Sequence, residues 1–293
     1  MRVSSPGTWL VTGAAGMLGT DVRTVLDEAG IAHDDVTRAD VDLLDEAAVD
    51  RAVAGHDVVV NCAAWTAVDD AEEHEPEAFA SNAVAPSLLA LAARRHGARL
   101  VHVSTDYVFD GTATTPYDED HPRAPRSAYG RTKAAGEWAV LSTVPRQALV
   151  LRTAWLYGAH GSCFPRTIAN AAHQRGSLQV VDDQVGQPTW TRDVAELALA
   201  LVQRGADGGV WHATSSGQAS WFEFARTVVA TAGLSPDIVS PTDSSAFQRP
   251  APRPAYSVLG HRRLQEAGVA PIGDWRDRWA AAGASVLAVD QVG

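Results

Sequence analysis

The chain of 293 residues contains only two cysteines, Cys62 and Cys163, which lie far apart and lack the spacing of metal ligands. This scarcity excludes a disulfide framework, indicates a reducing compartment and gives no reason to expect a metal site. The sequence also has no apolar run approaching the ~18 residues of a membrane span, and residues 1–7 lack the apolar core of a signal peptide. We therefore expect a cytoplasmic protein without a membrane segment.

Positive charge is scarce as well. The chain carries 24 Lys and Arg residues against 35 Asp and Glu residues, a formal net charge of -11. A diffuse basic surface for nucleic acid or anionic lipid is therefore not expected, and any anionic ligand must be held by a few local groups. The length suffices for a sizeable core, arranged as one large domain or as two lobes.

The beginning of the chain has the pattern of a dinucleotide-binding turn. A short apolar strand over residues 8–12 leads into Gly13-x-x-Gly16-x-x-Gly19, and a helical pattern follows to about residue 29. Glycines at such a turn let the backbone approach a pyrophosphate, whose charge then faces the N–H groups and the positive dipole end of the helix. A glycine triad alone is a weak signal, but a strand before it and a helix after it strengthen the prediction.

The end of the next expected strand, residues 35–37, bears on the choice of cofactor. Arg38 follows this strand at the position where dinucleotide folds meet the adenosine ribose, and a guanidinium group suits a 2′-phosphate. This favours NADPH over NADH, although a solvated loop charge explains Arg38 almost as well. Asp42, further along, is better placed to contact the adenine amine.

A third buried strand, residues 57–61, precedes small residues that would let a cofactor lie against the backbone. Ala63 and Ala64 occupy these positions, and Trp65 and Thr66 follow over the expected central cleft. The alternative is a small-residue turn that packs on a neighbouring helix.

Polar side chains that suit catalysis follow the strand expected over residues 100–103. Thr105 and Asp106 lie at its carboxyl end, the edge at which open α/β sheets bind ligands. Tyr129 and Lys133 are four residues apart in a helical pattern, so their side chains share one helix face. A cation beside a phenol lowers the phenol pKa from its usual value of about 10, which makes a usable general acid. Because Tyr-x-x-x-Lys is common by chance, this hypothesis depends on the other motifs.

The alternation of short apolar strands with helical segments predicts an α/β fold. We expect a Rossmann-like, doubly wound parallel sheet with a smaller α/β substrate-binding lobe towards the C-terminus. Segments punctuated by Gly and Pro replace the regular alternation after residue 153. We therefore assign residues 1–153 to the dinucleotide-binding core, with residues 186–213 returning to it, and residues 154–185 and 214–293 to the substrate-binding lobe.

Other conspicuous residues are expected to be structural. Asn82 is a polar amide inside the apolar pattern of a helix expected over residues 76–96, where it is suited to hold neighbouring backbone together. Most of the tryptophans are expected in the core, because each buries a large apolar area. Trp155 is the exception, since it follows a strand end beside the proposed site. The tryptophans expected in the core are Trp190, Trp211, Trp221, Trp275 and Trp279.

These motifs occur in one chain with the order and spacing of a known family. The glycine turn, the Ser104-Thr105-Asp106 strand end and Tyr129-x-x-x-Lys133 resemble the extended short-chain dehydrogenase/reductases. More narrowly, further segments make the chain similar to the dTDP-4-dehydrorhamnose reductase family over nearly its whole length. These segments are residues 104–111, 116–120, 129–137, 152–158, 183–189, 220–225 and 253–254.

The resemblance implies reduction of the C4 ketone of a dTDP-4-keto-6-deoxy sugar by NADPH, with NADH as the alternative cofactor. A hydride passes to C4, Tyr129 protonates the oxygen, Thr105 hydrogen-bonds that oxygen, and Lys133 tunes Tyr129 and holds the ribose. With Arg38 included, the expected cofactor contacts are Gly13, Gly16, Met17, Leu18, Arg38, Asp42, Ala63, Ala64, Thr66, Tyr129 and Lys133. The expected substrate contacts are Thr66, Thr105, Asp106 and Trp155.

Two residues depart from the family pattern and keep alternatives open. Cys163 stands where members usually carry Asn, and Trp65 replaces a tyrosine, so a reductase of the dihydrostreptose-type branch is one alternative. A non-catalytic NADP-binding regulatory subunit of the methionine adenosyltransferase type is a second, and a nucleotide-sugar epimerase or dehydratase is a third, because a fold does not fix a function. We expect a monomer or a homodimer.

Overall fold

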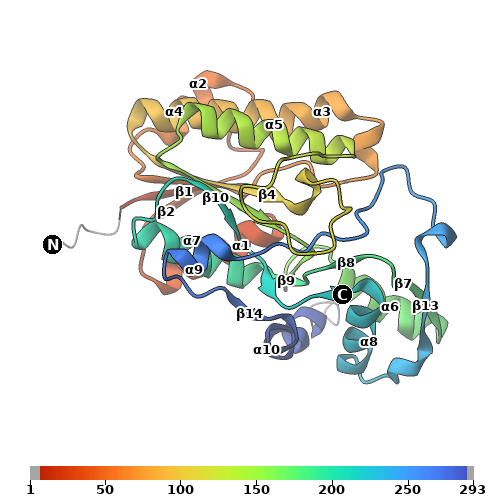
Figure 1. Cartoon of the computed structure of the whole chain (residues 1–293). Coiled ribbons are helices and arrows are strands. Elements are labelled where there is room, and N and C mark those ends of the chain that lie inside the picture. The colour runs from red at the N-terminus through yellow and green to blue at the C-terminus, as the bar shows by residue number, and fades with distance from the viewer. Residues whose placement is uncertain (1–6, 289–293) are drawn as a thin grey trace.

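A six-stranded parallel sheet forms the centre of the fold (Figure 1). The structure is a computed structural model and describes residues 7–288. The strands of the sheet are β1 (Trp9–Thr12), β2 (His33–Val36), β3 (Val58–Asn61), β4 (Arg99–Thr105), β5 (Ala148–Thr153) and β10 (Gly209–His212), in the order β10-β5-β4-β3-β1-β2. Every neighbouring pair is parallel. This arrangement confirms the predicted Rossmann-like sheet.

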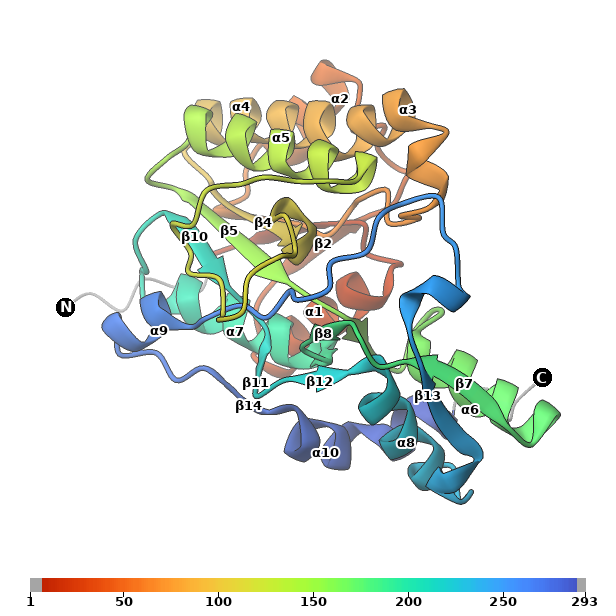
Figure 2. The ribbon, with the colours of Figure 1, turned by 45° about the vertical axis from the view of Figure 1, so that its right-hand side comes forward.

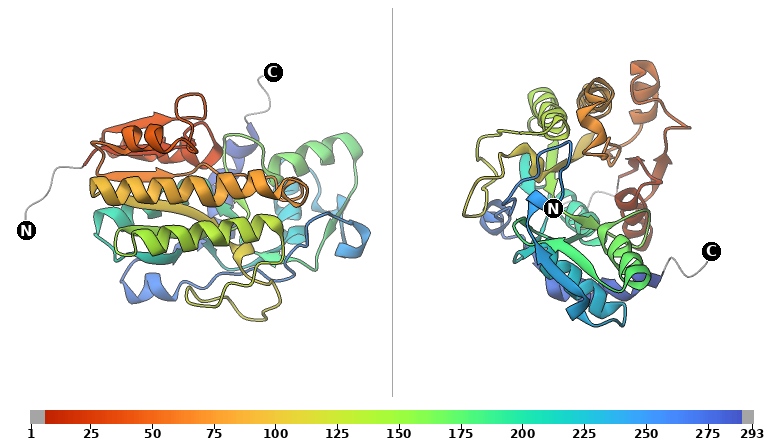
Figure 3. Two further views of the ribbon diagram at one scale, coloured as in Figure 1. Left: turned by 90° about the horizontal axis from the view of Figure 1, so that it is seen from above. Right: turned by 90° about the vertical axis from the view of Figure 1, so that its right-hand side faces the viewer.

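Helices cover both faces of the sheet. One face carries α1 (Met17–Glu28) and α7 (Thr191–Gln203), and the other carries α2 (Glu46–Val53), α4 (Ala85–His96) and α5 (Ala128–Thr143). Seen from above, α4 and α5 run side by side (Figure 3). Successive strand residues point to opposite faces, so Leu10 packs towards α2 and α4 while Val11 packs towards α1 and α7. Burial on both faces explains why these strands are continuous apolar runs.

The order of the strands reverses at β1. β2 lies on one side of β1 and β3 on the other, so the connections that follow β1 and β3 diverge. A crevice results at the carboxyl ends of these two strands, and open α/β sheets bind their ligands at such switch points. The glycine turn follows β1 and the small-residue segment follows β3, so the topology brings the two predicted cofactor segments to this crevice.

The helix predicted over residues 76–96 is interrupted in the structure. α3 (Glu75–Phe79) passes into a π-helical turn, Ala80–Val84, before α4 begins. Pro86 has no N–H to donate to the carbonyl of Asn82 four residues earlier, which favours a local widening of the helix. The prediction of one continuous helix was therefore wrong at its middle.

The second lobe consists of three packed helices and short strands that pair two by two (Figure 2). The helices are α6 (Phe164–Arg175), α8 (Trp221–Thr231) and α10 (Trp275–Ala288). The strands are β6 (Leu156–Tyr157), β7 (Leu178–Val181), β8 (Val185–Gly186), β9 (Thr189–Trp190), β11 (Ser215–Ser216), β12 (Ala219–Ser220), β13 (Val239–Thr242) and β14 (Ile272–Asp274). Trp275 and Trp279 are buried among these helices, and Trp211 is buried on β10 of the sheet, which confirms their predicted place in the core.

The chain passes between the two lobes more often than the sequence suggests. α7 and β10 return to the sheet. A later segment also returns, because α9 (Arg262–Glu266) lies against β10, and Leu264 and Ile272 pack in the core between the sheet and α1. Figure 2 shows this segment crossing from β13 to α9. The domain limits given above stay a prediction. Residues beyond position 214, such as Leu264 and Ile272, nevertheless pack in the core of the first lobe. No helix within residues 7–288 has the length and apolar character needed to cross a membrane.

Candidate active site

The turn after β1 is shaped to receive a phosphate group. Gly13 has a φ of +68°, and a Cβ at this position would lie 2.6 Å from the backbone nitrogen of Ala63 in the turn after β3. Glycine is therefore required by the backbone conformation and by the close approach of the two turns. Gly16 is the N-cap of α1 and makes no side-chain cap. The N–H groups of the first helical turn are consequently available to an anion.

A cavity of about 540 Å³ lies at the switch point, among the turns that follow β1, β2 and β3. Of the predicted cofactor contacts, it is lined by Gly13, Gly16, Arg38, Asp42, Ala63 and Ala64. It is also lined by residues that no sequence motif marks, among them Ala15, Val41, Leu43, Leu44 and Ser81. Mostly apolar walls with a few polar groups are typical of a site for a cofactor base.

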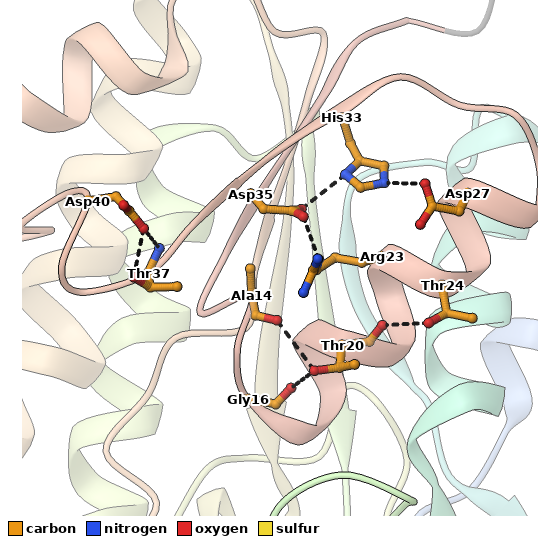
Figure 4. A network of polar contacts seen from close by, with 10 residues as sticks. All are labelled: Ala14, Gly16, Thr20, Arg23, Thr24, Asp27, His33, Asp35, Thr37 and Asp40. Carbon is orange, nitrogen blue, oxygen red and sulfur yellow. Dashed lines mark hydrogen bonds and ion pairs between the residues drawn. The ribbon is translucent and has the colours of Figure 1, made fainter.

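The acidic side chains near the end of β2 are already paired (Figure 4). Asp35 forms an ion pair with Arg23 of α1, and Asp40 accepts hydrogen bonds from the backbone N and the Oγ1 of Thr37 at 2.9 and 2.7 Å. Arg38, by contrast, is exposed at the cavity and has no ion pair or side-chain hydrogen bond within residues 7–288. Arg38 is therefore an unpaired cation at this end of the cavity, beside the carboxylate of Asp42, and a guanidinium group suits a 2′-phosphate.

Five predicted cofactor contacts lie outside the cavity lining, namely Met17, Leu18 and Thr66, and the catalytic residues Tyr129 and Lys133. The side chain of Leu18 is buried in the core between the sheet and α1, and that of Met17 packs against the core of the second lobe. Only their backbone N–H groups, in the first turn of α1, are placed to face a phosphate. Thr66 is exposed just beyond Trp65. Their roles stay predictions.

The predicted catalytic side chains meet at the carboxyl end of β4. Thr105 is the last residue of this strand, and its hydroxyl lies close enough to the phenol of Tyr129 to lower the pKa of that phenol. Tyr129 and Lys133 lie on successive turns of α5, whose first turn is capped by the Ser127 side chain, which accepts from the backbone N of Gly130 at 3.1 Å. A strand end and a helix thus bring a hydroxyl, a phenol and an ammonium group together.

Burial dominates the acid–base properties of the phenol and the ammonium. It raises the pKa of Tyr129 to about 12 and lowers the pKa of Lys133 to about 8. Lys133 Nζ donates a hydrogen bond to the carbonyl of Val103 at 2.6 Å. Desolvation is the largest cause of the raised pKa of Tyr129, and the tuning of this phenol by Lys133 stays a prediction. The phenol therefore stays protonated at neutral pH, as a proton donor must.

A buried ion pair supports α5 one turn beyond Lys133. Glu137 accepts hydrogen bonds from the Nε and Nη2 of Arg152, both at 2.8 Å, and from the Oγ of Ser104 at 2.6 Å. Burial by itself would raise the pKa of Glu137, but Arg152 and Ser104 hold that pKa below its usual value. Because Ser104 lies on β4 and Arg152 on β5, the charged group of Glu137 fixes the catalytic helix to both strands.

Asn82 braces the loop that follows β3. Its Oδ1 accepts from the backbone N of Trp65 at 2.9 Å, and its Nδ2 donates to the carbonyl of Trp65 at 3.1 Å and to Thr132 Oγ1 at 3.0 Å. A Cβ on Gly136 would lie 2.1 Å from the carbonyl oxygen of Asn82, so only glycine lets α5 approach the π-helical turn this closely. These contacts confirm the structural role expected for Asn82.

Trp155 lies at the junction of the two lobes in a backbone conformation that side chains rarely adopt. Its φ is +47°, and it is the one non-glycine residue with a positive φ within residues 7–288. Its indole stacks on that of Trp221 at the start of α8, with ring centroids 3.5 Å apart and planes 7° from parallel. The stack leaves at most one face of the Trp155 ring for the expected contact with a sugar. Conformations of this kind are typical of functional sites.

Cys163 is the N-cap of α6 but makes no capping hydrogen bond. Its thiol instead lies 3.9 Å from the carbonyl oxygen of Gly158, and the side chain is buried in the core of the second lobe. The asparagine of the family pattern would accept from N–H groups of the first turn at such a position. Cys163 in place of asparagine therefore leaves the N-terminus of α6 without a side-chain cap.

Asp69 contacts a distant segment of the chain, and no sequence motif predicts this contact. Its carboxylate accepts from Arg253 Nη2 at 2.8 Å and from the backbone N of Ala251 at 3.2 Å, and it pairs with Arg249 at 3.5 Å. This link joins the loop after β3 to a segment at least 180 positions later in the chain. A cavity of about 240 Å³, lined in part by Arg126 and Arg253, lies beside it.

Comparisons with known proteins agree with this geometry. The sequence pattern of the RmlD substrate binding domain family matches residues 8–287. The chain is 51% identical to a probable dTDP-4,6-dihydroxy-2-methyloxan-3-one 4-ketoreductase of Streptomyces antibioticus, over 96% of each protein. It is 47% identical to a dTDP-4-dehydrorhamnose reductase of Streptomyces griseus, over 92% of this chain and 90% of that protein.

The fold is similar to solved structures as well. One is the crystal structure of a dTDP-4-dehydrorhamnose reductase of Bacillus anthracis in complex with NADP. It superimposes with a TM-score of 0.91 at 31% sequence identity, over 95% of this chain and 99% of that one. The likeness extends over both lobes.

Proposed function

The chain belongs to the RmlD substrate binding domain family, and from this premise we propose that it uses NADPH to reduce the C4 ketone of a dTDP-4-keto-6-deoxy-L-hexose. The product is dTDP-L-rhamnose when the substrate is dTDP-4-dehydro-L-rhamnose, or a related antibiotic deoxysugar such as dihydrostreptose. The observation that carries the proposal is the grouping of Thr105, Tyr129 and Lys133 at the sheet edge that also bears the cofactor cavity.

The cavity at the switch point fits a phosphorylated dinucleotide. Gly13 leaves no Cβ where the backbone must approach a pyrophosphate, and the first turn of α1 offers its N–H groups. Arg38 is placed to pair with a 2′-phosphate, and Asp42, Ala63 and Ala64 line the adenosine end. NADPH, when bound there, supplies the hydride.

Tyr129 provides the proton of the reaction. With a pKa of about 12 it is protonated at neutral pH, and we assign to it the donation of a proton to the C4 oxygen as negative charge develops there. Lys133, with a pKa of about 8, is mostly cationic at pH 7, and its charge favours the phenolate left behind. Lys133 is buried and Tyr129 is partly buried, which limits the water that would otherwise screen this interaction.

The substrate is placed between the catalytic edge and the second lobe. We assign contacts with the deoxysugar to Thr66 and Trp155, and a contact at the strand end to Asp106. Arg126 and Arg253 line a cavity beside the catalytic turn and are suited to the diphosphate in a chain that is otherwise acidic. A cytoplasmic monomer or homodimer completes the proposal.

The alternative functions have weaker support. A regulatory subunit that only binds a dinucleotide needs the cavity, but it does not need a buried phenol and ammonium held beside it. A dehydratase needs a pair of carboxyl groups next to the threonine, and the sequence Asp106-Tyr107 offers only one. That carboxylate accepts a hydrogen bond from Thr105 at 2.9 Å. The reductase uses every one of these groups.

The direct test follows NADPH oxidation by its absorbance with dTDP-4-dehydro-L-rhamnose as substrate. We expect oxidation that depends on both the sugar and the enzyme, with dTDP-L-rhamnose as the product identified by mass spectrometry. Tight NADPH binding without turnover of this sugar or of other dTDP-4-keto-6-deoxy sugars would contradict the proposal and favour a binding subunit. Turnover of only one of the other sugars would assign the chain to that branch.

A further inference from the structure

Residues 249–256, called the strap below, belong to the segment that runs from β13 in the second lobe to α9 beside the sheet (Figure 2). Every second residue in its first half is a proline, at positions 250, 252 and 254. Proline fixes its own φ and restricts the residue before it to extended conformations. The strap is therefore a stiff piece of chain with few backbone N–H groups that could hold it in place.

The end of the strap is fixed by backbone contacts with the segment that follows β4. Gly111 in this segment has a φ of +75°, and a Cβ there would lie 2.5 Å from the Cα of Pro254. The backbone N of Tyr256 donates to the carbonyl of Gly111 at 3.1 Å. Only glycine permits so close an approach, so this end of the strap needs no side chain to hold it.

The beginning of the strap is held by one side chain from the loop after β3. Asp69 accepts from Arg253 Nη2 at 2.8 Å and from the backbone N of Ala251 at 3.2 Å. Ala251 is 1% exposed, and its N–H is one of only three that residues 249–254 possess. Arg249 pairs with the same carboxylate at 3.5 Å, but its side chain is 60% exposed, so this pair contributes little. Asp69 is therefore the anchor of this end.

The same hydrogen bond places Arg253 at the cavity of about 240 Å³, which residues 252–255 of the strap and residues 107–112 line together. A guanidinium group carries five N–H donors. Nη2 of Arg253 donates to Asp69, Nη1 lies 3.5 Å from the carbonyl oxygen of Ala251, and Nε has no partner among residues 7–288. Arg253 thus keeps donors for an anion while Asp69 holds it.

The other charged groups of this cavity favour an anion as well. Arg126 lines it and has no ion pair or side-chain hydrogen bond within residues 7–288. The carboxylate of Asp110, which also lines the cavity, already accepts from the Tyr117 hydroxyl at 2.7 Å and from Thr112 Oγ1 at 2.8 Å. Asp69 lies outside the lining. Two guanidinium groups therefore face the cavity, and the carboxylate that orients one of them does not.

We propose that Asp69 is a positioning residue for the substrate, because it anchors the strap and holds Arg253 where the guanidinium group binds the diphosphate of the nucleotide sugar. Without the anchor, the strap and the arginine side chain would lose conformational freedom only when the substrate binds, at the expense of affinity. Asp69 imposes this order beforehand and does not touch the substrate. The inference rests on the proposed function, which supplies the diphosphate.

Two effects of Asp69 on a bound diphosphate have opposite signs. Its negative charge repels the phosphates, whereas its hydrogen bonds pre-organise Arg253. The Asp69 side chain is 28% exposed, so water and salt screen the repulsion. The order of the strap is lost altogether when the anchor is removed. We therefore expect removal of Asp69 to weaken the binding of the diphosphate.

The test measures the Kd of dTDP by calorimetry, together with kcat and KM for the sugar substrate. D69A should raise the Kd of dTDP and the KM about tenfold, the contribution of a hydrogen bond to a charged group, with kcat at saturation and the Kd of NADPH retained. D69N should be intermediate, because its amide oxygen still accepts from Ala251. R249A is the matched control on the same carboxylate and should change the Kd less than about twofold. In the R253A background, D69A should add little.

A second measurement follows the anchor in the free protein. Because residues 249–254 have only three backbone N–H groups, hydrogen–deuterium exchange of this stretch reports closely on Ala251. D69A should accelerate the exchange, and R249A should not. Unchanged exchange in D69A would show that Asp69 does not anchor the strap and would overturn the proposal.

The remaining outcomes separate this inference from the proposed function. Faster exchange with an unchanged Kd of dTDP would confine Asp69 to packing, and tighter dTDP binding in D69A would make Asp69 a competitor of the diphosphate; either result overturns the proposal. A wild-type protein that binds dTDP but reduces none of the sugars would contradict the reductase, while weaker dTDP binding in D69A would still support the role of Asp69. A wild-type protein that does not bind dTDP would overturn both.

Discussion

The two ends of the cleft are built in different ways. At the cofactor end, the turns after three neighbouring strands line an open cavity of about 540 Å³, and the cation that lines it, Arg38, is exposed. At the catalytic end, the charged groups are buried, with Lys133 2% exposed and Glu137 0% exposed. Their partners come from β4 and β5, including the carbonyl of Val103 and the guanidinium of Arg152. One end is open to solvent and the other is closed by packing.

The two ends therefore depend on different physical effects, one for binding the cofactor and the other for proton transfer. An exposed guanidinium attracts a phosphate through water, and its effect is local and screened by salt. The buried groups instead have altered proton affinities, with the pKa of Tyr129 raised to about 12, that of Lys133 lowered to about 8 and that of Asp106 raised to about 6. We therefore expect changes at the catalytic end to affect turnover and stability, and changes at the cofactor end to affect affinity.

The largest effect is expected from removal of the proton donor. Tyr129→Phe should lower kcat about 10²–10⁴-fold, the usual contribution of a general acid, while NADPH affinity stays near the wild-type value because the binding surface is retained. Turnover and NADPH fluorescence titrations measure the two quantities. The matched control is Tyr107→Phe, since this ring packs edge-on against Tyr129 at 5.6 Å, and it should keep most of its turnover. Similar kcat values for the two variants would place the acid elsewhere.

The next effect concerns the buried support of the catalytic helix. Glu137→Gln leaves the guanidinium of Arg152 buried without its carboxylate, so we expect a loss of about 3–5 kcal/mol in the free energy of unfolding. Chemical denaturation at pH 7 measures it. Because Arg152 lowers the pKa of Glu137, the pair stabilises the protein above pH 4.5, and this contribution is lost as the pH falls through the folded pKa. The difference between wild type and variant should shrink accordingly in acid.

An exposed pair of the same geometry is the control for that experiment. Glu75 accepts from the Nε and Nη2 of Arg131, both at 2.8 Å, but the two side chains are 41% and 45% exposed. Glu75→Gln should therefore cost less than about 1 kcal/mol. Equal losses in the two Gln variants would show that burial does not distinguish the catalytic end.

The cofactor end could be predicted from the sequence because its determinants are local. Gly13 and Gly16 follow directly on an apolar strand, and Ala63 follows another, so each motif carries its own structural context. The spacing of Tyr129 and Lys133 likewise predicts a shared helix face, whatever the rest of the chain does. Periodicity and turn chemistry suffice for features of this kind.

The acid–base properties of the catalytic end could not be predicted in the same way. The direction of the Tyr129 pKa shift depends on how much water the folded chain removes, and this is decided by segments far away in sequence. The hydrogen bond from Arg253 to Asp69 joins residues that are 184 positions apart. No local sequence pattern predicts that these two residues meet. The close approach of Gly136 to the carbonyl of Asn82 is likewise a tertiary contact that no local pattern predicts.

A smaller and more selective effect is expected at the cofactor end. Arg38→Ala should raise the Kd of NADPH about tenfold or more, the usual contribution of a hydrogen bond to a charged group. It should leave the Kd of NADH unchanged, because NADH lacks the 2′-phosphate. Arg51→Ala is the control, since Arg51 is exposed on α2 away from the cavity lining. Equal weakening of both cofactors by Arg38→Ala would make Arg38 a bystander.

The smallest effect tests whether the start of α6 belongs to the catalytic end. Cys163→Asn should supply the missing cap and raise the free energy of unfolding by about 1 kcal/mol, whereas the control Cys163→Ala loses the thiol contact with Gly158 and adds no cap. If the N–H groups of this helix end face the diphosphate of the substrate, the Asn variant should also change KM while kcat at saturation is retained. A gain of stability with an unchanged KM would confine Cys163 to the packing of the second lobe.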